Sequence, residues 1–134
     1  MSMNMQTPDA RSRPRVAAIA AFVPARDFAQ SRSFYLDLGF EQTWGNDAAC
    51  GLRIDGHDII LQNFHVKEHS ENFMMQLMVD DADAWWERIQ SSDLKEKYQL
   101  GTAKPPAMQP WGLRVLFLTD PSGVLWHIAE MPGR

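Results

Sequence analysis

Cys50-Gly51-Leu52-Arg53-Ile54 returns later in the chain as Trp111-Gly112-Leu113-Arg114-Val115, and this repetition is the strongest indication of the fold. Each copy runs into a glycine-containing turn, Asp55-Gly56 in the first and Asp120–Gly123 in the second. An apolar run follows each turn, so both copies predict a β-hairpin. Because the motif, the turn and the following strand all match between the two copies, the sequence predicts two structural units of about sixty residues each. The alternative is a coincidental match between two ordinary hairpins.

The first unit has the pattern β-α-β-β-β. The apolar run Val16–Val23 predicts a buried strand, and Asp27 is placed to cap a helix over residues 28–38 that ends at Gly39. Further strands are expected near residues 40–45, 50–54 and 58–64.

The second unit repeats this order. A strand is expected over 73–79, Asp80 or Asp81 caps a helix over 82–89, and strands follow near 97–103, 112–119 and 124–130. We therefore expect an α+β fold of paired βαβββ modules, whose curled mixed sheets surround a cleft suited to a small molecule. The expected boundaries are a disordered leader over 1–14, a first module over 15–64, a linker over 65–72 and a second module over 73–131.

The composition excludes several classes of protein. A chain of 134 residues with 45% apolar and 22% charged residues is typical of one soluble domain. A net charge of −4 with scattered Lys and Arg gives no basic surface for a nucleic acid. No apolar run approaches the ~20 residues of a membrane span. The single cysteine, Cys50, forms no internal disulfide, which fits a reducing cytoplasm.

Two motifs resemble those of a known superfamily. Ser33–Phe40 is similar to its "FY…LGF" helix end, and Asp120–Trp126 is similar to its "DP.G" last hairpin. The chain thereby resembles the vicinal oxygen chelate superfamily, also called the glyoxalase, bleomycin-resistance and dioxygenase group, over about residues 16–131. The resemblance implies the paired-module fold and, by family architecture, a homodimer.

Metal-dependent members of that superfamily hold a divalent ion with side chains from the first and last strands of each module. Carried onto this sequence, those positions fall on Ala20 and Ile60 in the first module and on Met74 and His127 in the second. Three of the four cannot bind a cation, whereas a catalytic Zn²⁺ needs about three protein ligands. Shifting the alignment by two residues along the first strand of the second module replaces Met74 by Gln76, whose amide is only a weak ligand. We therefore expect no metal and no other cofactor.

A ligand surface is predicted from strand alternation and by family analogy. Alternation places Met74, Gln76 and Met78 on one face of their strand, and Leu125 and His127 on one face of the last strand. Trp111 is predicted to offer stacking. The expected ligand-binding residues are therefore His127, Trp111, Gln76, Met74, Met78 and Leu125, with core filling as the alternative role for each Met and Trp.

Other motifs predict no chemistry. His65–His69 matches the H-x-x-E-H pattern of a metalloprotease, but that pattern works only on a helix, and here it is expected in a solvated linker. Ser122 lies in a turn that is not a nucleophile elbow, and the sequence indicates no base near Cys50, so no catalytic residue is assigned. Arg53 and Arg114 could clamp an anion, but facing solvent or a subunit interface is the favoured interpretation.

These observations predict a cytoplasmic homodimer that binds a small organic ligand without a metal. It is similar to the bleomycin-resistance branch, which sequesters drugs rather than transforming them. Two alternatives stay open: a metal-dependent glyoxalase-like lyase or isomerase, or a dioxygenase; and an interaction module without a small ligand. No nucleic acid or membrane partner is expected.

Overall fold

Two aspartates begin the two long helices, as predicted. In this computed structural model, which describes residues 13–133, a carboxylate oxygen of Asp27 accepts the N–H of Gln30 at 3.1 Å and one of Asp81 accepts that of Ala84 at 3.1 Å. These caps satisfy otherwise unpaired N–H groups and start α1 (Phe28–Leu38) and α3 (Ala82–Ser91). Helix α1 ends at Gly39, whose φ of 133° is strained for residues with a Cβ.

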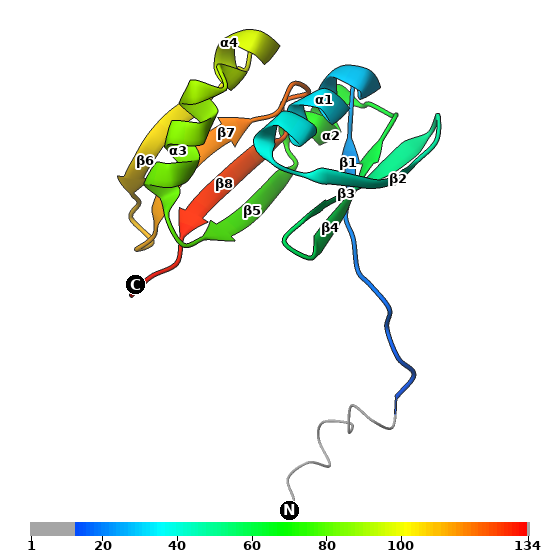
Figure 1. Cartoon of the computed structure of the whole chain (residues 1–134), viewed down its shortest axis with the longest axis horizontal. Coiled ribbons are helices and arrows are strands. Elements are labelled where there is room, and N and C mark those ends of the chain that lie inside the picture. The colour runs from blue at the N-terminus through cyan, green and yellow to red at the C-terminus, as the bar shows by residue number, and fades with distance from the viewer. Residues whose placement is uncertain (1–12, 134) are drawn as a thin grey trace, which may run out of the picture.

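Each helix lies against its own four-stranded mixed sheet (Figure 1). Sheet A has the order β1-β4-β3-β2 and sheet B the order β5-β8-β7-β6. β1 pairs with β4, and β5 with β8, in parallel; the other pairs are antiparallel. The strands of sheet A are β1 (Phe22–Pro24), β2 (Glu41–Gly45), β3 (Ala49–Ile54) and β4 (His57–Gln62). The strands of sheet B are β5 (Met74–Val79), β6 (Ala103–Met108), β7 (Arg114–Thr119) and β8 (Leu125–Glu130). This confirms the predicted α+β fold of paired βαβββ modules.

The repeated pentapeptide does not mark equivalent positions, although the duplication is real. Its first copy lies inside β3, whereas Trp111 to Leu113 of the second copy precede β7. The two hairpins also differ at their turns. Asp55 and Gly56, both with positive φ, close the first hairpin in two residues, whereas the second needs the longer turn from Asp120 to Val124.

Two predicted strands are corrected. Val16–Val23 was expected to be a buried strand, but β1 begins at Phe22 and residues 16–19 are exposed. The strand expected at 97–103 is instead β6, which follows a short helix, α4 (Leu94–Tyr98). Pro105 and Pro106 lie in β6, and the pairing with β7 shifts register between Lys104 and Ala107. Proline has no N–H to donate, so this edge strand tolerates the pair.

The ends of the modules also differ from the expectation. The predicted leader, 1–14, lies outside the described residues except for 13 and 14. The predicted linker, 65–72, contains a short helix, α2 (Lys67–Glu71). Within the described part of the chain, no helix is long and apolar enough to span a membrane.

The two modules join through a buried polar contact. The Tyr35 hydroxyl on α1 donates to the Asp120 carboxylate at 2.7 Å and accepts the indole N–H of Trp126 on β8 at 2.9 Å. The backbone N–H groups of Ser122 and Val124 donate to the other Asp120 oxygen. Burial raises the pKa of Asp120 above its usual value, and burial also raises that of Tyr35. The polar groups of this junction are therefore hydrogen-bonded to one another within the core.

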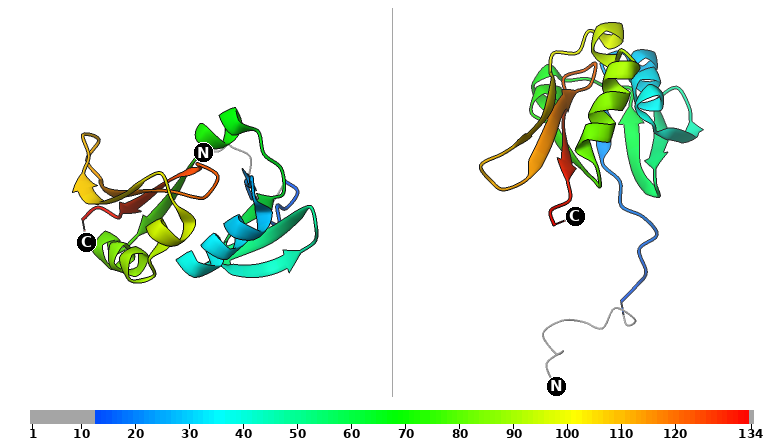
Figure 2. Two further views of the ribbon diagram at one scale, coloured as in Figure 1. Left: turned by 90° about the horizontal axis from the view of Figure 1, so that it is seen from above. Right: turned by 60° about the vertical axis from the view of Figure 1, so that its left-hand side comes forward.

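A second junction joins α1 to α3 and α4, which lie side by side in Figures 1 and 2. The Arg88 guanidinium on α3 donates to the Leu38 and Asp37 carbonyls at the end of α1. The Asp37 carboxylate accepts from Lys97 at 2.7 Å and from the Tyr98 hydroxyl at 2.5 Å. These bonds, to Lys97 first, lower the pKa of Asp37.

Both junctions lie on the helix-facing sides of the sheets. Tyr35 and Phe40 of the first module pack edge-to-face against Trp126 of the second, and one apolar core includes buried residues of both modules. Because the modules meet through these sides, residues 13–133 leave the opposite side of each sheet uncovered. We call these sides the open face of sheet A and the open face of sheet B.

We expect Tyr35→Phe to lower the free energy of unfolding by about 1–3 kcal/mol, because it leaves a buried carboxylate oxygen and the Trp126 N–H without a partner. Urea unfolding measures this loss. Tyr98→Phe is the matched control: it removes a hydroxyl whose acceptor, Asp37, keeps Lys97 and is partly exposed, so the expected loss is smaller. An equal loss in both variants would contradict the central role of Tyr35.

The lowered pKa of Asp37 makes a second prediction. A carboxyl with a folded-state pKa below its usual value of 3.8 stabilises the fold above that value and loses its contribution as the pH falls through the folded-state pKa. Asp37→Asn should therefore be less stable than the parent protein at neutral pH, and the difference should shrink on acidification. Urea unfolding over a pH series tests this, and a difference independent of pH would contradict it.

Candidate ligand-binding face

The predicted ligand-binding residues of β5 and β8 share the open face of sheet B. The parallel register places Met74 opposite Leu125, and Gln76 opposite His127. Since alternate residues of a strand point to the same side, Met78 joins them at the end of β5. The side chains of Met75 and Leu77, which alternate with these residues, pack toward the core.

An aromatic group surrounds His127. The Trp111 ring stacks on the imidazole with a centroid distance of 6.2 Å and an interplanar angle of 30°. Phe117, opposite His127 on β7, meets the same imidazole edge-on at 4.8 Å. The structure thus brings together Trp111 and His127, two of the residues expected to bind a ligand, and adds Phe117. Alternation along β7 separates Phe117 and Thr119 from the buried Leu116 and Leu118, and this pattern was the available signal for Phe117.

This face is apolar and open to solvent in the single chain. The side chains of Met74 and Trp111 are 64% and 57% exposed, and Gln76 is also exposed. His127 and Leu125 are half-buried. Large exposed apolar side chains that adjoin one another indicate a binding surface rather than ordinary surface variation. The arrangement offers stacking, adaptable thioethers and two hydrogen-bonding groups, the Gln76 amide and the His127 imidazole.

The open face of sheet A carries a second aromatic group. Trp44 lies over Gly51, where an added Cβ would come within 2.3 Å of the indole nitrogen. Phe22 and Ile60 are paired neighbours on the same side. Because Gly51 has no side chain, the indole can approach the strand closely at this position.

The donor chemistry does not fit a divalent cation. The register places the first-strand positions two residues later than predicted: Gln76, not Met74, is opposite His127, and Phe22, not Ala20, is opposite Ile60. Two hydrocarbon side chains, one amide and one imidazole supply no carboxylate, and a metal centre needs about three good ligands. Among residues 13–133, no group of three or more His, Cys, Asp or Glu is placed to hold a metal.

The remaining candidate motifs do not assemble a site. Of the H-x-x-E-H pattern, Glu68 and His69 lie in α2, and the His69 ring contacts Phe73, while His65 precedes the helix. Arg53 forms an ion pair with Asp58 at 2.8 Å. Arg114 forms ion pairs with Asp83 and Glu130. The two arginines are thus each paired with carboxylates of this chain and do not form a joint binding site for an anion.

Neither Cys50 nor Ser122 is activated as a nucleophile. Cys50 is buried, and burial raises the pKa of its thiol above the usual value, which opposes thiolate formation. Ser122 accepts the Arg26 backbone N–H at 2.8 Å and lies 3.3 Å from the Ser31 hydroxyl. Both side chains are therefore part of the packing and hydrogen bonding of the fold, in keeping with the prediction that neither is catalytic.

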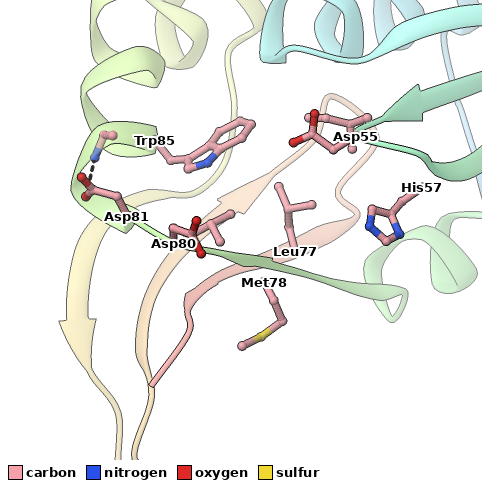
Figure 3. A pocket seen from close by; sticks show the side chains of 10 residues that line it. Asp55, His57, Leu77, Met78, Asp80, Asp81 and Trp85 are labelled. Carbon is pink, nitrogen blue, oxygen red and sulfur yellow. Dashed lines mark hydrogen bonds between the residues drawn. The ribbon is translucent and has the colours of Figure 1, made fainter. Parts of the chain in front are cut away.

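A separate pocket of about 360 Å³ lies at the free edge of β5, between the Asp55–His57 turn and the start of α3. Figure 3 shows Trp85 and Leu77 pointing into it while Asp55 borders it from the first module. Met78 points to the other side of the strand. Asp80 and Asp81 complete an acidic rim. Met78 is also among the residues that line this pocket, so the pocket adjoins the open face of sheet B at that residue.

Solved structures share this architecture. A bleomycin-binding protein from Streptomyces verticillus, complexed with copper(II)-bleomycin, is 22% identical with a TM-score of 0.73, covering 89% of this chain and 99% of that one. A bleomycin resistance determinant encoded on transposon Tn5 is 20% identical with a TM-score of 0.70, covering 87% and 99%. Lactoylglutathione lyase from Agrobacterium tumefaciens is 17% identical with a TM-score of 0.62, covering 87% and 95%.

A search of curated protein sequences finds no significant match to this chain. The family model of the Glyoxalase/Bleomycin resistance protein/Dioxygenase superfamily, however, matches residues 15–128. That range includes both βαβββ modules from β1 to the middle of β8. The chain therefore belongs to the glyoxalase/bleomycin resistance protein/dioxygenase superfamily.

Proposed function

We propose that this chain is a metal-free binding protein for a flat, apolar or aromatic small molecule. The observation that carries the proposal is the stacked group of Trp111, His127 and Phe117 beside the exposed methionines of β5. Exposed aromatic rings attract conjugated ligands by stacking, and methionine adapts to their outlines. The Gln76 amide and the His127 imidazole would fix the orientation of a polar substituent.

The proposal includes a homodimer, because one chain offers only half of an enclosing site. The open face of sheet B is a surface rather than a cavity, and small-molecule sites usually bury most of their ligand. The open face of sheet A, with Phe22 and Trp44, has the matching apolar character. Placed opposite each other in two copies, these faces would form a cleft with aromatic groups on both walls.

Sequestration in the cytoplasm is the proposed role, since the face holds no residue set for metal-assisted or nucleophilic catalysis. The bleomycin-binding neighbours are similar to this chain in fold, and bleomycin is therefore a reasonable first probe. Flat aromatic compounds without its metal-binding part form the second group of probes.

We expect Trp111→Ala and His127→Ala each to weaken binding of a ligand found by thermal-shift screening at least about tenfold, the effect of losing ~1.4 kcal/mol of contact. Isothermal titration calorimetry measures the affinity. Both variants should keep the parent fold by circular dichroism, because neither side chain lies in the core.

Leu36→Ala is the control for this experiment, because Leu36 is an exposed apolar residue on α1, away from both open faces. It should leave the affinity unchanged. If Trp111→Ala and His127→Ala also bind a verified ligand normally, the open face of sheet B is not its site.

Metal content tests the other part of the proposal. Protein purified without an affinity tag should hold far less than about one divalent ion per chain by elemental mass spectrometry, because the face lacks ligands for one. Added Zn²⁺, Ni²⁺, Mn²⁺ or Fe²⁺ should not raise the melting temperature. A stoichiometric ion whose removal abolishes an activity would instead favour a lyase or dioxygenase.

A further inference from the structure

A row of four side chains crosses the open face of sheet B. The register places Lys104 on β6 opposite Phe117 on β7. Phe117 is in turn opposite His127 on β8, and His127 is opposite Gln76 on β5. Residues directly opposite each other on neighbouring strands project to the same side of the sheet. The row therefore extends from the aromatic group around His127 to an amide at one end and to an ammonium at the other.

Lys104 gives this face a local positive charge. It is the only Lys, Arg, Asp or Glu that register and alternation place on the open face of sheet B among the described strand residues. Its side chain is exposed, and no carboxylate within residues 13–133 forms an ion pair with it. Arg114 lies on the helix-facing side instead, where Asp83 and Glu130 pair with it. The face is thus locally cationic although the net charge of the chain is −4.

The spacing of the row sets the size of a molecule that could use all of it. Neighbouring strands lie about 4.8 Å apart, so the backbones that carry Lys104 and Gln76 are separated by roughly 14 Å. The flexible four-carbon stem of Lys104 can carry its ammonium inward over part of this distance. Two fused aromatic rings lying over Phe117 and His127 would then reach the ammonium at one end and the amide at the other.

We propose that the ligand of the open face of sheet B is a flat aromatic acid. Its rings lie against Trp111 and Phe117, its carboxylate pairs with the Lys104 ammonium, and a polar substituent at the far end meets the Gln76 amide. An ammonium beside an apolar surface favours a ligand that combines an anion with a conjugated ring system. This inference rests on the proposed function and names the chemical class of its ligand.

The test compares two probes of the same shape that differ in charge, 6-hydroxy-2-naphthoate and its neutral amide, 6-hydroxy-2-naphthamide. The parent chain should bind the acid at least about fivefold more tightly than the amide in isothermal titration calorimetry, because only the acid forms a charge-assisted contact. Lys104→Gln should weaken binding of the acid alone, and so remove the preference. Lys104→Arg keeps the charge and should keep the preference.

Lys95→Gln is the matched control, because it removes the same charge from an exposed position on α4, which packs on the helix-facing side of the fold. Its preference for the acid should equal that of the parent. Salt gives a second readout: added NaCl should weaken binding of the acid but not of the amide, and Lys104→Gln should abolish this difference. A lysine that only protects an edge strand from pairing would respond to neither comparison.

Equal affinity of the parent for the two probes, or a preference for the acid that survives Lys104→Gln, would overturn the inference. If both probes bind equally and both are weakened by Trp111→Ala, the ligand face stands and only the charge assignment fails. If neither probe binds the parent at millimolar concentration, the aromatic-acid class is refuted. The proposed function falls separately, when a ligand verified by thermal-shift screening binds Trp111→Ala and His127→Ala as it binds the parent.

Discussion

The buried carboxylate of Asp120 is the constraint on which the arrangement of the two modules depends. It accepts hydrogen bonds from its own turn and from the Tyr35 hydroxyl of the other module. An unpaired carboxylate at this depth would cost several kcal/mol, so the modules are held in the relative position that supplies these donors. Trp126 adds its N–H to the same hydroxyl, which ties the last strand to α1.

That junction determines which surfaces remain for function. Because the helix-facing sides of both sheets are largely packed into one core, the open faces are left free in residues 13–133. The aromatic group around His127 lies on one open face, and Trp44 with Phe22 lies on the other. β1 of sheet A and β5 of sheet B are edge strands, each paired with only one neighbouring strand. A chain built this way leaves apolar side chains of both sheet faces exposed, and in the proposed homodimer a second copy would cover them.

Prediction from the sequence worked best where a signal acts within a few residues. Asp27, Asp81 and Gly39 marked helix ends because capping is a local hydrogen-bonding requirement. Strand alternation likewise placed Met74, Gln76 and His127 on one face. Prediction from the sequence failed at β6, where an edge position tolerates Pro105 and Pro106. It also failed at residues 16–21, whose apolar character predicted a buried strand although Val16 and Ile19 are exposed in the single chain.

The sequence by itself determined the paired βαβββ order, the two capped helices, and the lack of carboxylates at the strand positions where the superfamily's metal-dependent members hold an ion. Only the tertiary structure decided that the two copies of the pentapeptide are out of register, that Phe117 joins His127 and Trp111, and which sheet faces stay open. The physical reason is distance along the chain. Caps and turns are stabilised by immediate neighbours, whereas strand register and burial depend on partners dozens of residues away, whose packing the local pattern does not encode.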